Sequence, residues 1–224
     1  MKPMSPSAAS LLPARGAGYA MAACALLMIV AIGLHPQATT HRAAEFMVEA
    51  AHLGTSLKIV HGTAIAFVLT LLFGMSVYSA RRGMQRELVV AALVAYAAGI
   101  AVVIFAALID GFLIAMIAER YIGVPPNVLQ VGAAVVAACG AAIQVLTKAG
   151  VAMISAAIAL WAADLFLEPR PARTTAIVGC VAALVPVAVL FAVPRLAPHT
   201  LEIVVVCEGA WYLAIARLLI RGEA

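Results

Sequence analysis

Charged side chains are scarce in this chain: they make up 11% of its 224 residues, against 66% hydrophobic residues. Such a low charge content excludes an ordinary soluble domain, in which about a quarter of the residues are charged. The net charge is +4, but no basic stripe with interleaved aromatic residues accompanies it. Nucleic-acid-binding domains display such a stripe, so the sequence predicts no nucleic-acid partner.

Cysteine is also rare, and none of the four cysteines belongs to a C-x-x-C pair. Each cysteine lies within an apolar tract, so we interpret all of them as small buried hydrophobic residues rather than as a disulfide framework. The sequence contains no P-loop, no G-x-S-x-G and no H-E-x-x-H pattern. These absences remove the familiar signatures of nucleotide, serine-nucleophile and zinc-peptidase chemistry. An enzymatic activity is therefore not favoured.

Long hydrophobic tracts dominate instead, and the mean hydropathy is +1.11. A membrane-spanning helix needs about 20 mostly apolar residues. The sequence predicts an all-α fold, a polytopic membrane helix bundle with six transmembrane helices in one domain, 16–221, after a cytoplasmic tail, 1–15. The first tract is longer than the apolar core of a signal peptide, and Pro36 follows it, so we expect a retained helix. The expected tracts are 16–34, 57–80, 87–118, 128–167, 174–193 and 200–220.

The distribution of basic residues predicts the orientation of the bundle. With six spans, nine Lys and Arg residues fall on the side of the termini and four on the other side. The positive-inside rule then places both termini in the cytoplasm of a bacterium, with the chain in the inner membrane. The fourth tract has about twice the length of one span. Splitting it would contradict the charge rule, so the third and fourth helices either tilt strongly or project beyond the bilayer on the outer side.

The segment 38–54 predicts a short amphipathic helix on the extracytoplasmic side. His41, Glu45, Glu49 and His52 recur at spacings of four, four and three, which places them on one helical face. Glu49-x-x-His52 is the ligand pair that dimetal bundles use, although such bundles need further ligands from other helices. We interpret the four residues as a candidate metal or haem site. A water-exposed face and a pH-sensitive surface are the alternatives.

Four ionisable residues fall inside the expected spans: His61, Asp110, Lys148 and Glu208. Charges inside a membrane are costly and usually pair or line a site. All four are expected in the outer half of the bundle, where an Asp110–Lys148 ion pair with His61 and Glu208 nearby would form an outward-facing ligand site. The alternatives are a structural clasp and a proton relay. Asp164, near the inner interface, is interpreted as an anchor.

Two short motifs carry a resemblance to a family. The run from His61-Gly62 through Leu72-Phe73-Gly74 to Arg81, with the later stretch Ala107 to Phe112, resembles an uncharacterised family of bacterial six-helix membrane proteins. In that family a His opens one span and an Asp-Gly pair lies late in the next. The resemblance implies six helices and a role for His61 and Asp110. It implies no activity.

Three functions remain open from the sequence. The first is a protein that binds or helps transport a small ligand, a transition metal or haem at the outward-facing polar site. The second is a structural or accessory subunit of a membrane complex, since Ala- and Gly-rich helix faces favour close helix packing. The third is a metal-dependent lipid hydrolase within the membrane. The lipid bilayer is the expected partner in each case, together with a second copy or a larger complex.

Overall fold

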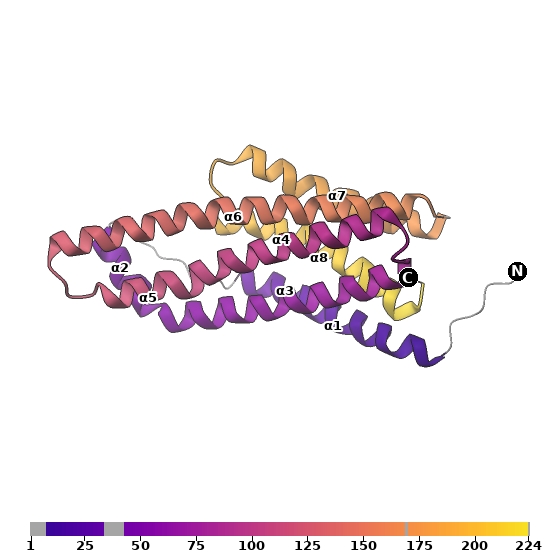
Figure 1. Ribbon diagram of the computed structural model, residues 1–224, viewed down its shortest axis with the longest axis horizontal. Helices are drawn as coiled ribbons and strands as arrows, with labels where there is room; N and C mark the ends of the chain where they lie inside the picture. The colour runs from indigo at the N-terminus through magenta and orange to yellow at the C-terminus, as the bar shows by residue number, and fades with distance from the viewer. Residues whose placement is uncertain (1–7, 34–42, 169, 224) are drawn as a thin grey trace, which may run out of the picture.

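The computed structural model describes residues 8–33, 43–168 and 170–223, and these residues form helices without any strand (Figure 1). The helices pack lengthwise into one elongated bundle. Their bounds are α1 Ala8–Gly33, α2 Ala43–His52, α3 Gly54–Arg82, α4 Glu87–Leu108, η1 Ile109–Leu113, α5 Ile114–Arg120, α6 Pro126–Phe166, α7 Arg170–Ala192 and α8 Pro198–Arg221.

Six helices of the described part are long and apolar enough to cross a membrane, which confirms the all-α membrane bundle. They are α1, α3, the continuous helix from α4 through η1 to α5, α6, α7 and α8. The first helix starts at Ala8, so residues 8–15 are helical rather than an extended tail. Residues 1–7 of the expected tail lie outside the described part of the chain.

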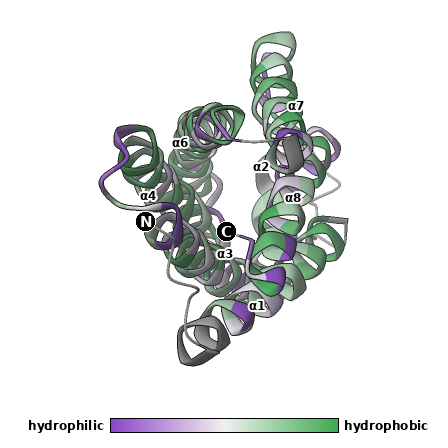
Figure 2. Ribbon diagram, turned by 90° about the vertical axis from the view of Figure 1, so that its right-hand side faces the viewer, coloured by the Kyte–Doolittle hydropathy of each residue, from purple (hydrophilic) through white to green (hydrophobic). Residues whose placement is uncertain are grey.

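The six long helices form a closed ring in which α1, α3, α4, α6, α7 and α8 each contact the next, and α8 returns to α1 (Figure 2). The outer surface of this ring is apolar. Large hydrophobic side chains are exposed on it, among them Val94, Phe105 and Phe191. In a membrane protein such a surface faces lipid, because apolar side chains and lipid tails are compatible.

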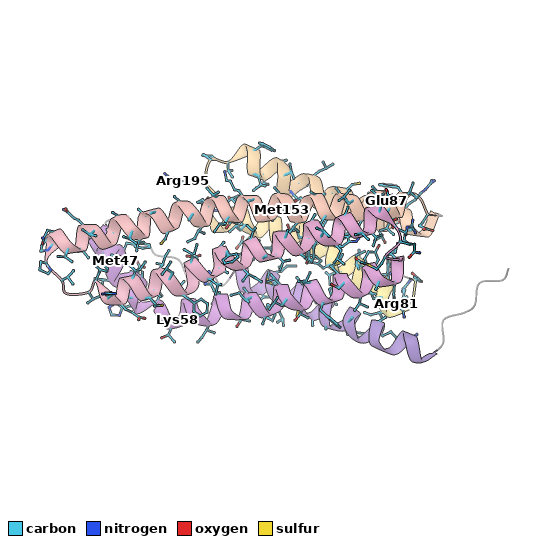
Figure 3. All side chains as sticks on the ribbon, in the orientation of Figure 1. Met47, Lys58, Arg81, Glu87, Met153 and Arg195 are labelled. Atoms are coloured by element: carbon cyan, nitrogen blue, oxygen red, sulfur yellow. The ribbon has the colours of Figure 1, made fainter. Side chains whose placement is uncertain are left out.

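The two ends of the bundle differ in their charged residues and in how far their helices extend. Arg81 and Glu87 lie at one end, called the basic end here, and Met47 and Lys58 lie at the opposite, far end (Figure 3). At the basic end α3 turns into α4 through Gly83, whose φ of 106° suits a residue without a side chain. At the far end α2 packs through Met47 and Ala50 against α5 and α6.

The far end projects beyond the connection between α7 and α8. Lys148 of α6 donates hydrogen bonds of 3.0 Å to the carbonyl oxygens of Val193 and Pro194 in that connection. Gln144, one turn earlier, exchanges two hydrogen bonds with the backbone of Leu196. The part of α6 before Gln144 therefore extends about 27 Å past the connection, at 1.5 Å per residue. Arg195 lies well short of Met47 along the bundle, so the long helices project (Figure 3).

Candidate functional site

The far half of the bundle contains one irregular turn, and Asp110 lies in it. Between α4 and α5, residues Ile109–Leu113 form a π-helical turn, in which the Ile114 N–H donates to the carbonyl of Ile109. This i to i+5 bond inserts one extra residue into the turn and changes the direction of the side chains that follow. Such turns are rare and often occur at functional sites.

Asp110 faces His61 of α3 across this turn. The Nε2 atom of His61 lies 3.1 Å from Oδ2 of Asp110, and its Nδ1 atom lies 2.9 Å from the Leu57 carbonyl oxygen. The His61 side chain is buried, with 9% of its surface exposed, whereas the Asp110 side chain is 36% exposed. The pair is therefore anchored on the histidine side and accessible on the carboxyl side.

The hydrogen bonds of His61 determine where its protons are. A carbonyl oxygen only accepts, so the bond to Leu57 requires a hydrogen on Nδ1. Nε2 then faces the carboxyl oxygen of Asp110, and a hydrogen bond there needs one more proton between the two atoms. This proton belongs either to an imidazolium or to a carboxylic acid. The pair thus shares one acidic proton. A cation that binds the same nitrogen and oxygen atoms would displace this proton.

Two glycines allow α3 and the π-helical turn to approach each other. A Cβ atom on Gly111 would overlap the Cβ atom of His61 and lie 2.5 Å from its Cγ atom. A Cβ atom on Gly62 would make only an ordinary contact of 3.7 Å with Phe112. Gly111 is therefore required for the His61–Asp110 contact, whereas Gly62 is not.

The other two residues of the predicted ligand site lie elsewhere. Lys148 bonds to Val193 and Pro194, and the structure shows no Asp110–Lys148 ion pair in the described part of the chain. The expected pairing fails because α6 projects past the α7–α8 connection, which brings backbone carbonyls to the Lys148 ammonium. Glu208 is buried within α8, and its Oε1 atom has no hydrogen-bond partner among the described residues.

The predicted metal or haem face is only partly described. His41 lies outside the described residues, while Glu45, Glu49 and His52 belong to α2. Glu45 and His52 are exposed and Glu49 is half-buried. No group of three or more His, Cys, Asp or Glu side chains within residues 8–33, 43–168 and 170–223 is arranged to hold a metal ion.

A second polar cluster lies at the basic end. From the sequence, its residues were interpreted only as loop charges and an anchor. Arg82 donates to Asp164 at 2.6 Å and to Glu168 at 3.2 Å. Arg86 contacts the same two carboxylates, at 2.7 Å and 2.8 Å. We call these four residues the basic-end clasp. Their sequence signal is two arginines and two acids, each pair spaced by four residues at the same end of the bundle.

Known proteins add nothing to this geometry. No protein-family model, no curated protein and no solved structure matches this chain. The site is therefore interpreted from its own residues.

Proposed function

We propose that this chain is a multi-pass protein of the bacterial inner membrane that binds a small cation at an outward-facing site formed by His61 and Asp110. Its role is ligand binding or transport. The observation that supports this proposal is the 3.1 Å contact between Nε2 of His61 and Oδ2 of Asp110, from which we infer the shared proton, and the 36% exposure of the Asp110 side chain. A cation that displaces this proton meets one neutral nitrogen and one negative oxygen.

The orientation follows from the positive-inside rule. Arg81, Arg82, Arg86, Arg217 and Arg221 lie at the basic end, which we place in the cytoplasm with both termini. The His61–Asp110 pair then faces the extracytoplasmic side. The resemblance to a bacterial six-helix family, carried by the same two residues, points to the same site.

A transition-metal ion is the cation that best suits these two atoms. Zinc binds imidazole nitrogen at about 2.0–2.1 Å and carboxylate oxygen at about 2.0–2.2 Å. Two such bonds at a tetrahedral angle match a separation slightly larger than the 3.1 Å observed. A haem fits poorly, because its iron would need an open approach to Nε2, where the Asp110 carboxyl group already lies.

The test is a zinc titration of the purified protein in detergent, with proton release measured in weakly buffered solution. We expect zinc to bind with release of the shared proton, and we expect His61→Gln and Asp110→Asn to abolish both signals. Glu119→Gln is the matched control, because Glu119 is an exposed carboxylate at the same end that pairs with Lys58. Zinc binding that survives in Asp110→Asn, or no proton release in the unsubstituted protein, contradicts the proposal.

A structural or accessory subunit is the second candidate, and one observation favours it. In the projecting part of α6, three alanines are exposed at spacings of four and three, a pattern that permits close helix packing. They are Ala134, Ala138 and Ala141. Purification of the chain as one defined species without a co-purifying partner would argue against this candidate. A catalytic zinc usually has three protein ligands and a water, and the described residues offer no group of three, so no observation favours the lipid hydrolase.

A further inference from the structure

Glu208 is a buried carboxyl group for which the proposed cation site has no use. It lies in the membrane-spanning part of α8 with 9% of its surface exposed. Its Oε1 atom has no hydrogen-bond partner among the described residues. An ionised carboxylate without a partner is costly in such an environment. The group therefore needs either a positive neighbour or a proton.

Within the described helices, the groups that interact with Glu208 carry no positive charge. The titratable groups that interact with it are Tyr96 of α4 and Tyr212 and Cys207 of α8. From α1, Ile29 packs at the adjacent Gly209. No basic side chain of the described residues forms an ion pair with Glu208. A bound proton is then the simplest way to neutralise the carboxyl group.

Aromatic ring contacts connect the level of Glu208 to the basic end. Tyr212, one turn along α8, contacts the ring of Tyr96 at 6.2 Å between centroids. Tyr96 contacts Trp161 at 5.4 Å, and Trp161 contacts Tyr78 at 6.4 Å. Tyr78 lies one turn from Arg82 of the basic-end clasp.

Several of the buried polar atoms along this half have no partner among the described residues. They include the Tyr78 hydroxyl, the Ser79 and Ser155 hydroxyls and the Trp161 indole nitrogen. Buried polar atoms in proteins are normally hydrogen-bonded, often through ordered water. These atoms thus place hydrogen-bonding groups between Glu208 and the basic end.

The opposite direction, toward His61 and Asp110, is apolar. Tyr96 meets Tyr212, so Glu208, one turn earlier on the antiparallel α8, lies near the level of Ile100. From Ile100 to Asp110 the helix rises about 15 Å, at 1.5 Å per residue. α3 and α4 fill this interval with Val68, Leu71, Ile100 and Val103, and the Thr70 hydroxyl bonds to its own helix at Ala66.

We propose that Glu208 is a second, internal proton-binding site, which is protonated at neutral pH and exchanges its proton with water at the basic end rather than with the His61–Asp110 end. The proton comes from water and returns to it, so no other reactant takes part. The proposal is independent of the cation site, because it rests on different residues in the other half of the bundle.

Infrared spectroscopy of the full chain in lipid bilayers tests whether Glu208 carries the proton. At pH 7 we expect a carbonyl band of a protonated carboxyl group that shifts on ¹³C labelling of glutamate side chains. This label assigns the band to glutamate without a substitution. The band disappears in Glu208→Gln, which keeps the shape of the protonated group, and persists in Asp110→Asn. No protonated glutamate at pH 7, or a band that survives in Glu208→Gln, overturns the proposal.

Hydrogen–deuterium exchange of the same band tests through which end the proton exchanges. Tyr78→Phe removes one hydroxyl on the basic side, and we expect it to slow exchange about tenfold, as the loss of one hydrogen-bonding step would. Thr70→Val removes one hydroxyl on the opposite side, and we expect the rate to stay unchanged. Slowing by Thr70→Val, or no slowing by Tyr78→Phe, contradicts exchange through the basic end.

Discussion

The polar groups at the two ends of this bundle are used differently. In the basic-end clasp two arginines meet two carboxylates, and Arg82 and Asp164 are almost fully buried, with side-chain exposures of 11% and 2%. At the far end a single histidine meets a single carboxyl group that is 36% exposed. The clasp satisfies its charges internally, whereas the His61–Asp110 pair shares one proton and remains accessible.

This difference separates two roles that the sequence left undecided. A structural clasp needs complete pairing in a buried place, because an unpaired buried charge is destabilising. A binding site needs a polar group that can give up its protein partner for a ligand. Such a group must therefore be incompletely paired and open to the ligand. The geometry of the clasp suits a stabilising role at the basic end, and the His61–Asp110 pair is the site for which we propose a function. Substitutions at the two ends should therefore have unequal effects on folding and on binding.

The largest effect is expected from Asp164→Asn. Asp164 accepts hydrogen bonds from Arg82 and contacts Arg86, so the substitution leaves the two guanidinium groups of the clasp with one carboxylate, that of Glu168. Breaking a buried ion pair costs about 3–5 kcal/mol. We expect the free energy of unfolding to fall by an amount near the lower end of this range. The midpoint of unfolding in detergent measures the change, and zinc-linked proton release should stay intact.

Glu119→Gln is the control for this loss, because it removes the same charge from the exposed Lys58–Glu119 pair. Exposed pairs contribute about 0–1 kcal/mol. If Asp164→Asn and Glu119→Gln lower the free energy of unfolding equally, the clasp is not the stabilising element that we infer.

Gly111→Ala is expected to lower stability less than Asp164→Asn does, but to abolish zinc binding. The new Cβ atom would overlap the Cβ atom of His61, which is fixed to the backbone and cannot rotate away. Overpacking of this kind costs about 1–3 kcal/mol. The substitution should move His61 away from Asp110 and abolish zinc-linked proton release.

Gly62→Ala is the matched control beside the same histidine, since its Cβ atom meets only Phe112 at an ordinary distance. Alanine is favoured over glycine within helices by about 0.5–1 kcal/mol. We expect unchanged binding and equal or slightly higher stability. If Gly111→Ala behaves in the same way, close approach at Gly111 does not position the pair.

Hydropathy and charge were enough to predict the six long helices, because apolar length and basic turns are properties of each segment alone. The π-helical turn could not be predicted in this way, since the residues around Asp110 are as apolar as those of a regular helix. The helix α1 begins at Ala8, before the tract predicted at 16–34, because Pro13 and Arg15 interrupt the apolar run in the sequence without ending the helix.

Pairing between helices was harder to predict than the helices themselves. His61 and Asp110 were both singled out, but Asp110 was assigned to Lys148, since opposite full charges are the obvious partners. The actual partner depends on how far α6 projects, which moves Lys148 to the α7–α8 connection. The clasp could have been found, because Asp164 and the arginines were expected at the same membrane face.

The smallest effect concerns Glu168, the half-buried edge of the basic-end clasp. The hydrogen bond that Arg86 donates, followed by the charge of Arg82, lowers the pKa of Glu168 below its ordinary value of 4.5. A lowered folded-state pKa gives a stabilisation that is complete above pH 4.5 and disappears as the pH falls through the lowered pKa. For a carboxylate that is only half-buried, we expect at most about 1 kcal/mol.

Unfolding of the unsubstituted protein and of Glu168→Gln, compared across the acid range, measures this contribution. The two should differ near neutral pH and converge in acid, because protonated glutamate and glutamine both lack the charge that Arg86 binds. Glu87→Gln removes an exposed carboxylate at the same end and should show no such convergence. A difference that grows in acid would reverse the sign and show that Glu168 is not part of the clasp. The geometry of the clasp predicts that the buried Asp164 contributes more to stability than Glu168 does. A loss of stability in Glu168→Gln as large as that in Asp164→Asn would contradict this prediction.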